Sequence, residues 1–278
     1  MTPTTVHGSA SQLRDPRAFL RSARADFGPS CGIAWRLFLR DLRNAHRRSL
    51  LGYAWIVLPA LVNALAWIFL EDAGIVNTGD SEISYALFVL IGTTLWQSFI
   101  EAINAPFDKL GGAQSILTKF RLPAESFVLI GLGDVLFNTL VRMTLVAVVY
   151  VFLVDSMPLT VIVAPIGALA LIGFGLAIGT ILAPVGTLYS DVQRAVILLA
   201  GIWFFVTPIV YSPDEVSGAQ AFNPIAVLIV TTRDWLLTGD TRWPWAFAVV
   251  VGVIGLAVPV AYLAYRLLAP HLVDRVDA

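Results

Sequence analysis

Charged residues are scarce in this chain of 278 residues. Asp, Glu, Lys and Arg make up 13% of it, about half the share usual in a soluble domain, while hydrophobic residues make up 58%. This balance excludes an ordinary soluble globular domain. It is typical of a helical protein that crosses a membrane several times, because each crossing takes about 20 mostly apolar residues.

Cysteine, lysine and histidine are also rare. Cys31 is the one cysteine, which excludes an intramolecular disulfide and a cysteine-based metal cluster. The two lysines, Lys109 and Lys119, follow Asp and Thr rather than the Gly of a phosphate-binding G-x-x-x-x-G-K-[ST] loop, so we expect no ATP hydrolysis by this chain alone. The three histidines have no carboxylate or cysteine at ligand spacing, and we expect no metal or cofactor to bind here.

The amino-terminal part divides into a tail and a helix. Residues 1–30 carry scattered Arg, Pro and Gly without the apolar stretch of a secretory signal peptide, which predicts a mobile or surface-lying tail. Residues 31–49 follow a helical period with a basic face of Arg36, Arg40, Arg43 and Arg47 opposite an apolar face. We expect an amphipathic helix in the membrane surface, with an ordinary solvated basic helix as the alternative.

The rest of the chain predicts an all-α, polytopic membrane fold. Six apolar runs lie in residues 50–267, and a cytoplasmic tail follows at 268–278; the runs are at about 51–70, 83–100, 126–154, 159–183, 192–211 and 245–267. Fifteen of the 18 basic residues fall on one side of this arrangement, which predicts that both termini are cytoplasmic. The loops 71–82 and 211–244 should face outward.

The second of these outward loops contains an apolar stretch, Ile225 to Leu237, of about 13 residues. This is too short to cross a bilayer. A re-entrant or interfacial hairpin between the fifth and sixth spans fits its length better.

Polar residues within the third run form a helical stripe. Asp134, Asn138 and Arg142 are spaced four residues apart, and such a stripe faces protein or water rather than lipid. It is either a buried polar seam between helices or the lining of a transport path. Gly175, Gly179 and Ala183 form a second row, for which packing within the chain is favoured over a dimer contact.

The sequence offers little for an enzyme. A membrane-embedded glycosyl- or acyltransferase would need converging acids or a histidine, and Glu101, Asp134 and Asp191 lie on different predicted elements. A non-transporting scaffold would need neither a buried charged stripe nor an outward hairpin. Five of the eight tryptophans lie near predicted span ends, as interfacial belts require: Trp67, Trp96, Trp203, Trp243 and Trp245.

Several segments together resemble a known family. RRSLLGYAW at 47–55, after RLFLRDLRNAH, resembles the entry of the type-2 ABC-transporter permeases that export polysaccharides such as O-antigen, capsule and teichoic acid. KFRLPAE at 119–125 is similar to their cytoplasmic connector, and Asp191-Val192 leading to TPIVY at 207–211 is similar to their fifth span. Asn223-Pro224 with Arg233 resembles their outward re-entrant segment. The likeness covers about residues 33–267.

The resemblance implies a half-transporter in the bacterial cytoplasmic (inner) membrane. Two copies would form one pore, and two separate ATP-binding subunits, which hold ATP and Mg, would drive export of a lipid-linked glycan; no nucleic-acid partner is expected. The connector from Pro106 to Pro123 would couple to those subunits, with contacts from Arg40, Arg43, Asp108, Lys109, Lys119 and Arg121. Pore or seam candidates are Asp134, Asn138, Arg142, Phe204, Phe205 and Tyr211. The alternative is a type-2 permease that exports a small drug or lipid.

Overall fold

The computed structural model describes residues 16–45, 52–74, 84–117, 123, 125–154, 157–212 and 218–276. Within these ranges the chain is helical and contains no β-strand. The main helices in chain order are α1 (Pro16–Ala45), α2 (Ala54–Asp72), α3 (Tyr85–Leu117), α4 (Glu125–Leu153), α5 (Ala164–Leu188), α6 (Ser190–Val206), α7 (Pro224–Leu237) and α8 (Pro244–Val276). Short 3-10 turns, η3 (Leu159–Ile162) and η5 (Gly218–Phe222), precede α5 and α7. The all-α membrane fold expected from the sequence is confirmed.

Five segments of the described chain are long and apolar enough to cross a membrane: Ala54–Asp72, Tyr85–Gly112, Glu125–Leu153, Leu159–Leu188 and Pro244–Leu268. The fifth apolar run of the sequence, expected over 192–211, becomes α6, which has 17 residues and ends at Val206. It ends early because Pro208 disfavours helical backbone at Thr207, whose conformation is extended. At about 25 Å, α6 is shorter than the roughly 30 Å hydrocarbon core.

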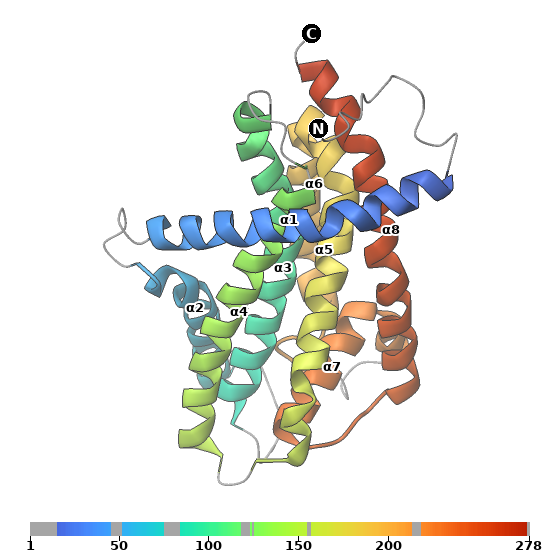
Figure 1. Cartoon of the computed structure of the whole chain (residues 1–278). Coiled ribbons are helices and arrows are strands. Elements are labelled where there is room, and N and C mark those ends of the chain that lie inside the picture. Colours follow the sequence, from blue (N-terminus) through green and yellow to red (C-terminus); the bar gives the residue numbers. More distant parts are fainter. Residues whose placement is uncertain are drawn as a thin grey trace.

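Helix α1 lies across the bundle, nearly at right angles to α4 and α5 (Figure 1). Its apolar face is fixed on α4, where Ala34 and Phe38 are buried against Phe127 and Ile130. Gly133 of α4 leaves the space for the ring of Phe38, because a Cβ there would lie 3.1 Å from Phe38 Cδ2. Arg36, Arg40 and Arg43 are exposed, whereas Ala34 and Phe38 of the same helix are buried. Residues 46–49 lie outside the described ranges.

The predicted boundary between the tail and the helix, at residues 30 and 31, was wrong. The helix begins at Pro16 and continues through Pro29, so residues 16–30 belong to α1 rather than to a mobile tail. Proline is well suited to the first position of a helix. The second half of this segment stays helical because Ala23 and Ser30 are buried on the same face as Ala34. Residues 1–15 lie outside the described part of the chain.

Helix α3 is the centre of the bundle. Its side chains Leu87, Ile91, Leu95 and Phe99 are fully or almost fully buried, and it packs on both α4 and α5. Small residues permit the approach of α5, because a Cβ on Gly175 would lie 2.6 Å from the Phe99 carbonyl oxygen and one on Gly179 would overlap Ile103. The row of small residues is therefore an intramolecular contact, as favoured from the sequence.

Candidate functional site

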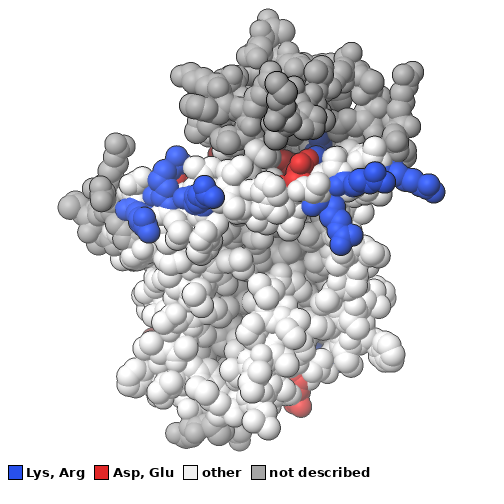
Figure 2. Space-filling view, in the orientation of Figure 1, with Lys and Arg blue, Asp and Glu red and all other residues white. Residues whose placement is uncertain are grey.

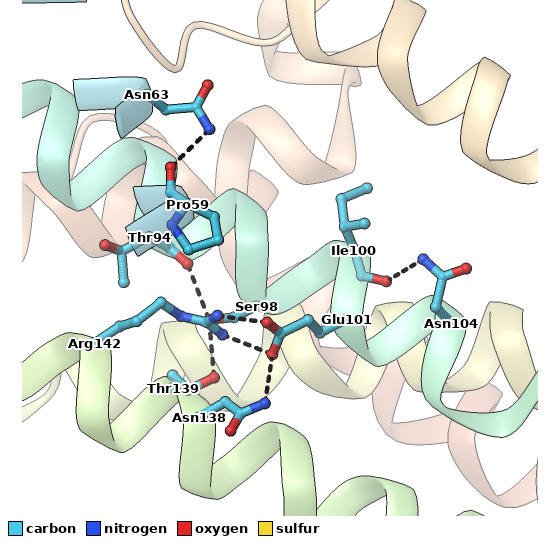
Figure 3. A network of polar contacts seen from close by, with 10 residues as sticks. All are labelled: Pro59, Asn63, Thr94, Ser98, Ile100, Glu101, Asn104, Asn138, Thr139 and Arg142. Carbon is cyan, nitrogen blue, oxygen red and sulfur yellow. Dashed lines mark hydrogen bonds and ion pairs between the residues drawn. The ribbon is translucent and has the colours of Figure 1, made fainter. Parts of the chain in front are cut away.

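A polar network joins α3 and α4 within the apolar part of the bundle (Figure 3). Arg142 on α4 is 1% exposed and donates from Nη1 to Glu101 Oε1 at 2.5 Å and from Nη2 to Glu101 Oε2 at 2.8 Å. A guanidinium in hydrocarbon must be paired or hydrated. The two parallel bonds to one carboxylate supply that pairing in the geometry that arginine favours.

Neighbouring hydroxyl and amide groups complete the network. Asn138 Nδ2 donates to Glu101 Oε2 at 3.3 Å, and Thr139 Oγ1 donates to Ser98 Oγ at 2.8 Å. Ser98 also accepts from Arg142 and donates to the Thr94 carbonyl at 2.9 Å. Asn138, Thr139, Ser98 and the Thr94 carbonyl thus surround one ion pair.

This polar contact between α3 and α4, here called the seam, continues toward α1 with a second ion pair. Asp134 Oδ2 lies 2.5 Å from Lys109 Nζ on α3, and Lys109 Nζ lies 3.7 Å from Asp41 Oδ2 on α1. Arg40 bonds the other oxygen of Asp41 at 2.9 Å. All three residues of the predicted stripe therefore face α3, and the charged chain runs from the bundle interior to the amphipathic helix.

The partners of this stripe were missed from the sequence. Glu101 was noted only as a lone carboxylate, and Lys109 was assigned to a cytoplasmic contact rather than to Asp134. A signal existed, because Glu101 and Arg142 are opposite charges next to or inside apolar runs, and such charges need partners. Their pairing across α3 and α4 could not be read from spacing along one helix.

The aromatic candidates lie where α6 meets α2 and α3. Phe204 packs on Trp67 and Trp96, with ring centroids 6.4 and 5.5 Å away, while Phe205 is exposed. Tyr211 donates from its hydroxyl to the Phe205 carbonyl at 3.2 Å. Trp96 is buried in the core, so its expected place in an interfacial belt was wrong. The structure thus brings Phe204, Phe205 and Tyr211 together but apart from the charged seam.

The end of α6 is an extended segment whose carbonyls are bonded by side chains. Arg233 of α7 donates from Nη1 to the carbonyls of Pro208 and Ile209, each at 3.1 Å, and its guanidinium carbon lies 3.5 Å from the centroid of the Phe88 ring. Tyr85 donates to the Val210 carbonyl and Gln220 to the Val206 carbonyl. Non-helical backbone at membrane depth requires such partners.

Helix α7 starts immediately beside this segment. Asn223 caps it by accepting from the backbone N–H of Ile225 and Ala226, and Pro224 occupies the first turn. The Asn223 side chain also accepts from Trp203 Nε1 and donates to Thr207 Oγ1. The cap therefore ties α7 directly to the end of α6, and residues 225–233 of α7 are buried in the bundle.

The cytoplasmic-contact candidates divide into exposed and internal groups. Arg40, Arg43 and Asp108 are exposed, and Asp108 Oδ1 accepts from Gln193 Nε2 at 3.1 Å, which ties the end of α3 to the start of α6. Lys109 faces the seam described above. Lys119 and Arg121 lie outside the described residues. No described group of three or more His, Cys, Asp or Glu side chains could hold a metal ion.

Basic side chains gather in one band of the molecular surface. Figure 2 shows them at the level of α1, with an almost uncharged surface below. At the same level, Arg266 near the end of α8 pairs with Glu125 at the start of α4, 3.0 Å apart, and with Asp26 of α1. An apolar body with a basic band at one end is the pattern of a protein held in a membrane.

These features define a multi-pass helical membrane protein. It has a charged seam between α3 and α4 and an extended segment between α6 and α7. Comparison with known proteins agrees with this class. The chain is 24% identical over 206 residues to the O-antigen export system permease protein RfbA of Myxococcus xanthus, covering 72% of this chain and 78% of that protein. It is 27% and 26% identical over 233 residues to two such RfbA proteins of Klebsiella pneumoniae, covering 79% of this chain and 87% of each relative.

No family model matches the chain. The three relatives nonetheless span most of it and carry the same description, so the resemblance to polysaccharide-export permeases is confirmed.

Proposed function

We propose that this chain is the permease subunit of an ABC exporter that moves a lipid-linked polysaccharide outward across the bacterial cytoplasmic membrane. The observation that carries the proposal is the similarity to O-antigen export permeases over about three quarters of the chain. The relatives' description favours glycan export over the export of a small drug or lipid. The energy would come from a separate ATP-binding subunit with its Mg, because the sequence has no phosphate-binding loop.

The proposal includes six membrane passes, with α6 as the fifth. Gln193 near the start of α6 contacts Asp108, and the Val210 carbonyl beyond its end accepts from Tyr85. Because Tyr85 and Asp108 are about 35 Å apart along α3, α6 and its extended end cover the same depth as a spanning helix. The contact of Arg266 with α1 and with the start of α4 supports an even number of passes.

We place α7 as a re-entrant hairpin on the outer side. Its 14 residues extend about 21 Å, less than a bilayer core. The side-chain bonds to the carbonyls of Val206, Pro208, Ile209 and Val210 support a chain reversal within membrane depth, because each of these carbonyls lacks a helical partner. The basic band at α1 supports a cytoplasmic position for both ends of the described chain.

A homodimer would complete the pore. Helices α2 and α6 are adjacent, because Trp67 packs on Phe204, and both carry large exposed apolar side chains, among them Val62, Leu65, Phe69, Leu198, Ile202 and Phe205. We propose that this face, the α2/α6 face, meets the second copy and that Phe205 and Tyr211 lie on the transport path. The seam of Asp134, Asn138 and Arg142 would then hold α3 and α4 together beside it.

Coupling to the ATP-binding subunits would use the end of α3 and the exposed side chains of α1. Asp108, Arg40 and Arg43 are exposed at this level, and Lys119 and Arg121 follow in the chain. Movement of this end would reach α4 through Lys109 and Asp134, and α6 through Gln193.

Purification tests the subunit assignment. The chain alone should show no ATPase activity, and co-expression with the ATP-binding subunit should give a stable complex with ATPase activity. Asp108→Ala with Arg40→Ala and Arg43→Ala should weaken that complex, whereas Arg242→Ala on the opposite side should not. ATP hydrolysis by the purified chain itself would contradict the assignment.

A further inference from the structure

A hollow of about 290 Å³ lies where the end of α1 and the start of α2 meet the seam between α3 and α4. Its lining combines Asp41, Lys109 and Asp134 with Tyr53, Phe137 and Asn138. It is open to the outside, because the side chains of Lys109 and Asp134 are 26% and 32% exposed. Its volume is at the small end of ligand sites, which suits one ring rather than an oligosaccharide.

The charged wall of the hollow is rich in hydrogen-bond acceptors. Asp41 and Asp134 both contact the ammonium of Lys109 in the hollow, and Arg40 outside the lining pairs with the other oxygen of Asp41. The Asn138 amide donates to Glu101 and is therefore held in place beside them. Carboxylate oxygens bind hydroxyl donors strongly, whereas the oxygens of a phosphate are acceptors and would find only the Lys109 ammonium as a charged donor in this lining.

The rest of the lining is largely aromatic and aliphatic. The rings of Tyr53 and Phe137 lie 5.5 Å apart between centroids at an angle of 49°, and Ile56 continues the apolar surface. A pyranose ring has hydroxyl groups around its edge and apolar C–H faces. A lining that combines carboxylate acceptors with aromatic rings matches both parts of that ring.

The position of the hollow suits a ligand that carries a lipid tail. It is lined by residues from the end of α1 and from the start of α2, where Trp55 is 60% exposed. The first turn of α2 precedes Val62, Leu65 and Phe69 of the α2/α6 face, so a tail attached to the ring could remain in the membrane beside that turn.

We propose that this hollow, the α1–α4 hollow, binds one sugar ring of the lipid-linked glycan at the membrane surface. The proposal rests on the proposed function and names a recognition site for its substrate. Asp134 and Asp41 accept from the ring hydroxyls, Tyr53 and Phe137 cover its apolar face, and Lys109 holds the two carboxylates in position.

Photolabelling tests the site in the complete complex, reconstituted in phosphatidylglycerol–phosphatidylcholine vesicles. The probe is an alkyl glucoside with a diazirine on the first carbons of its chain, and mass spectrometry locates the label. We expect label on residues 52–56 and 134–138, competed by unmodified alkyl glucoside. Competition by alkyl phosphocholine of the same chain length to the same extent would mean that a phospholipid headgroup binds there, and would overturn the proposal.

Matched variants separate recognition from folding. Asp134→Asn and Phe137→Leu should each lower the apparent affinity roughly tenfold, the effect of losing one hydrogen bond to a charged group or one ring contact. Asp191→Asn, an exposed acid of α6, and Phe152→Leu, an exposed ring at the far end of α4, should leave labelling unchanged. Complex yield from gel filtration shows that each variant folds, and a well-folded Asp134→Asn complex labelled as strongly as the wild type would overturn the site.

Failure of the proposed binding site and failure of the proposed function give different results. ATP-driven movement of lipid-linked glycan is measured in the same vesicles. Transport without label in the hollow would reject the site alone. Label in the hollow without transport would reject glycan export and keep a sugar-binding pocket.

Discussion

Arg142 of α4 and Glu101 of α3 form a bidentate ion pair inside the bundle, although they are 41 residues apart in the chain. The pair lies between two helices that also carry Lys109 and Asp134 at the end nearer α1. The seam thus has one ion pair in its interior and another at the membrane surface. Its inner pair holds α3 and α4 in register, because neither charge can remain without the other at that depth.

Removing one member of the inner pair should therefore cost stability. Arg142→Gln leaves Glu101 without its ion partner, and because the Glu101 side chain is 31% exposed we expect a cost below the roughly 3–5 kcal/mol of a fully buried pair. We expect a large fall in the yield of folded protein by gel filtration after detergent extraction, with partial recovery in Arg142→Gln combined with Glu101→Gln. If Arg142→Gln kept the yield of folded protein and altered only export, Arg142 would line the transport path instead.

The hydrogen bonds of Arg233 predict a local effect at the end of α6. Arg233→Leu removes both bonds to the carbonyls of Pro208 and Ile209 and the contact with the Phe88 ring. We expect faster hydrogen exchange in residues 207–211 and a lower melting temperature. Arg233→Lys should restore little, because an ammonium lacks the planar fork of guanidinium. Arg242→Leu, on a more exposed side chain, is the control; equal exchange in the two leucine variants would contradict this role.

The sequence was sufficient for features that repeat along a single helix. The period of 3.6 residues located the basic face at Arg36, Arg40 and Arg43 and the stripe of Asp134, Asn138 and Arg142. It could not supply Glu101 or Lys109 as their partners, because contacts between helices depend on the packing of the bundle. The small residues Gly131 and Ala105, which bring α4 onto α3, become meaningful only once those two helices are paired.

The positions of helix ends were the second feature that the sequence did not predict. Pro29 and the glycines near it suggested an irregular tail, yet burial of Ala23 and Ser30 keeps residues 16–30 helical. At α6, by contrast, the apolar run continues to Tyr211 while the helix ends at Val206 because of Pro208. A proline inside a helix is tolerated where neighbouring packing compensates for the lost hydrogen bond, and packing is not visible in the sequence.

The close contact of α5 with α3 predicts a sharp difference between two glycines. A Cβ at Gly175 would lie 2.6 Å from the Phe99 carbonyl oxygen, whereas one at Gly252 would meet no atom within 4 Å. Gly175→Ala should destabilise the fold by about 1–3 kcal/mol, because backbone must move. Gly252→Ala should leave stability unchanged or slightly raised. Thermal melting in detergent measures both, and similar melting temperatures would contradict the packing.

Membrane orientation can be tested with single cysteines in a Cys31→Ser background. Asp72→Cys and Thr238→Cys, both at exposed positions, should react with a membrane-impermeant thiol reagent in intact cells whose outer membrane has been permeabilised. Asn44→Cys at the end of α1 should react only after lysis. Labelling of Asn44→Cys in intact cells would reverse the proposed orientation, and labelling of Asp72→Cys without Thr238→Cys would contradict six passes.

Transport by the reconstituted complex tests the central claim most directly. The chain and its ATP-binding subunit are placed in vesicles with a radiolabelled lipid-linked glycan, and a glycosidase confined to the vesicle lumen reports glycan that has been moved inward. For complexes with their ATP-binding subunits outside, we predict ATP-dependent digestion that is lost when ATP hydrolysis is blocked. ATP-dependent movement of a small amphipathic drug or a phospholipid, with no movement of the glycan, would contradict the account.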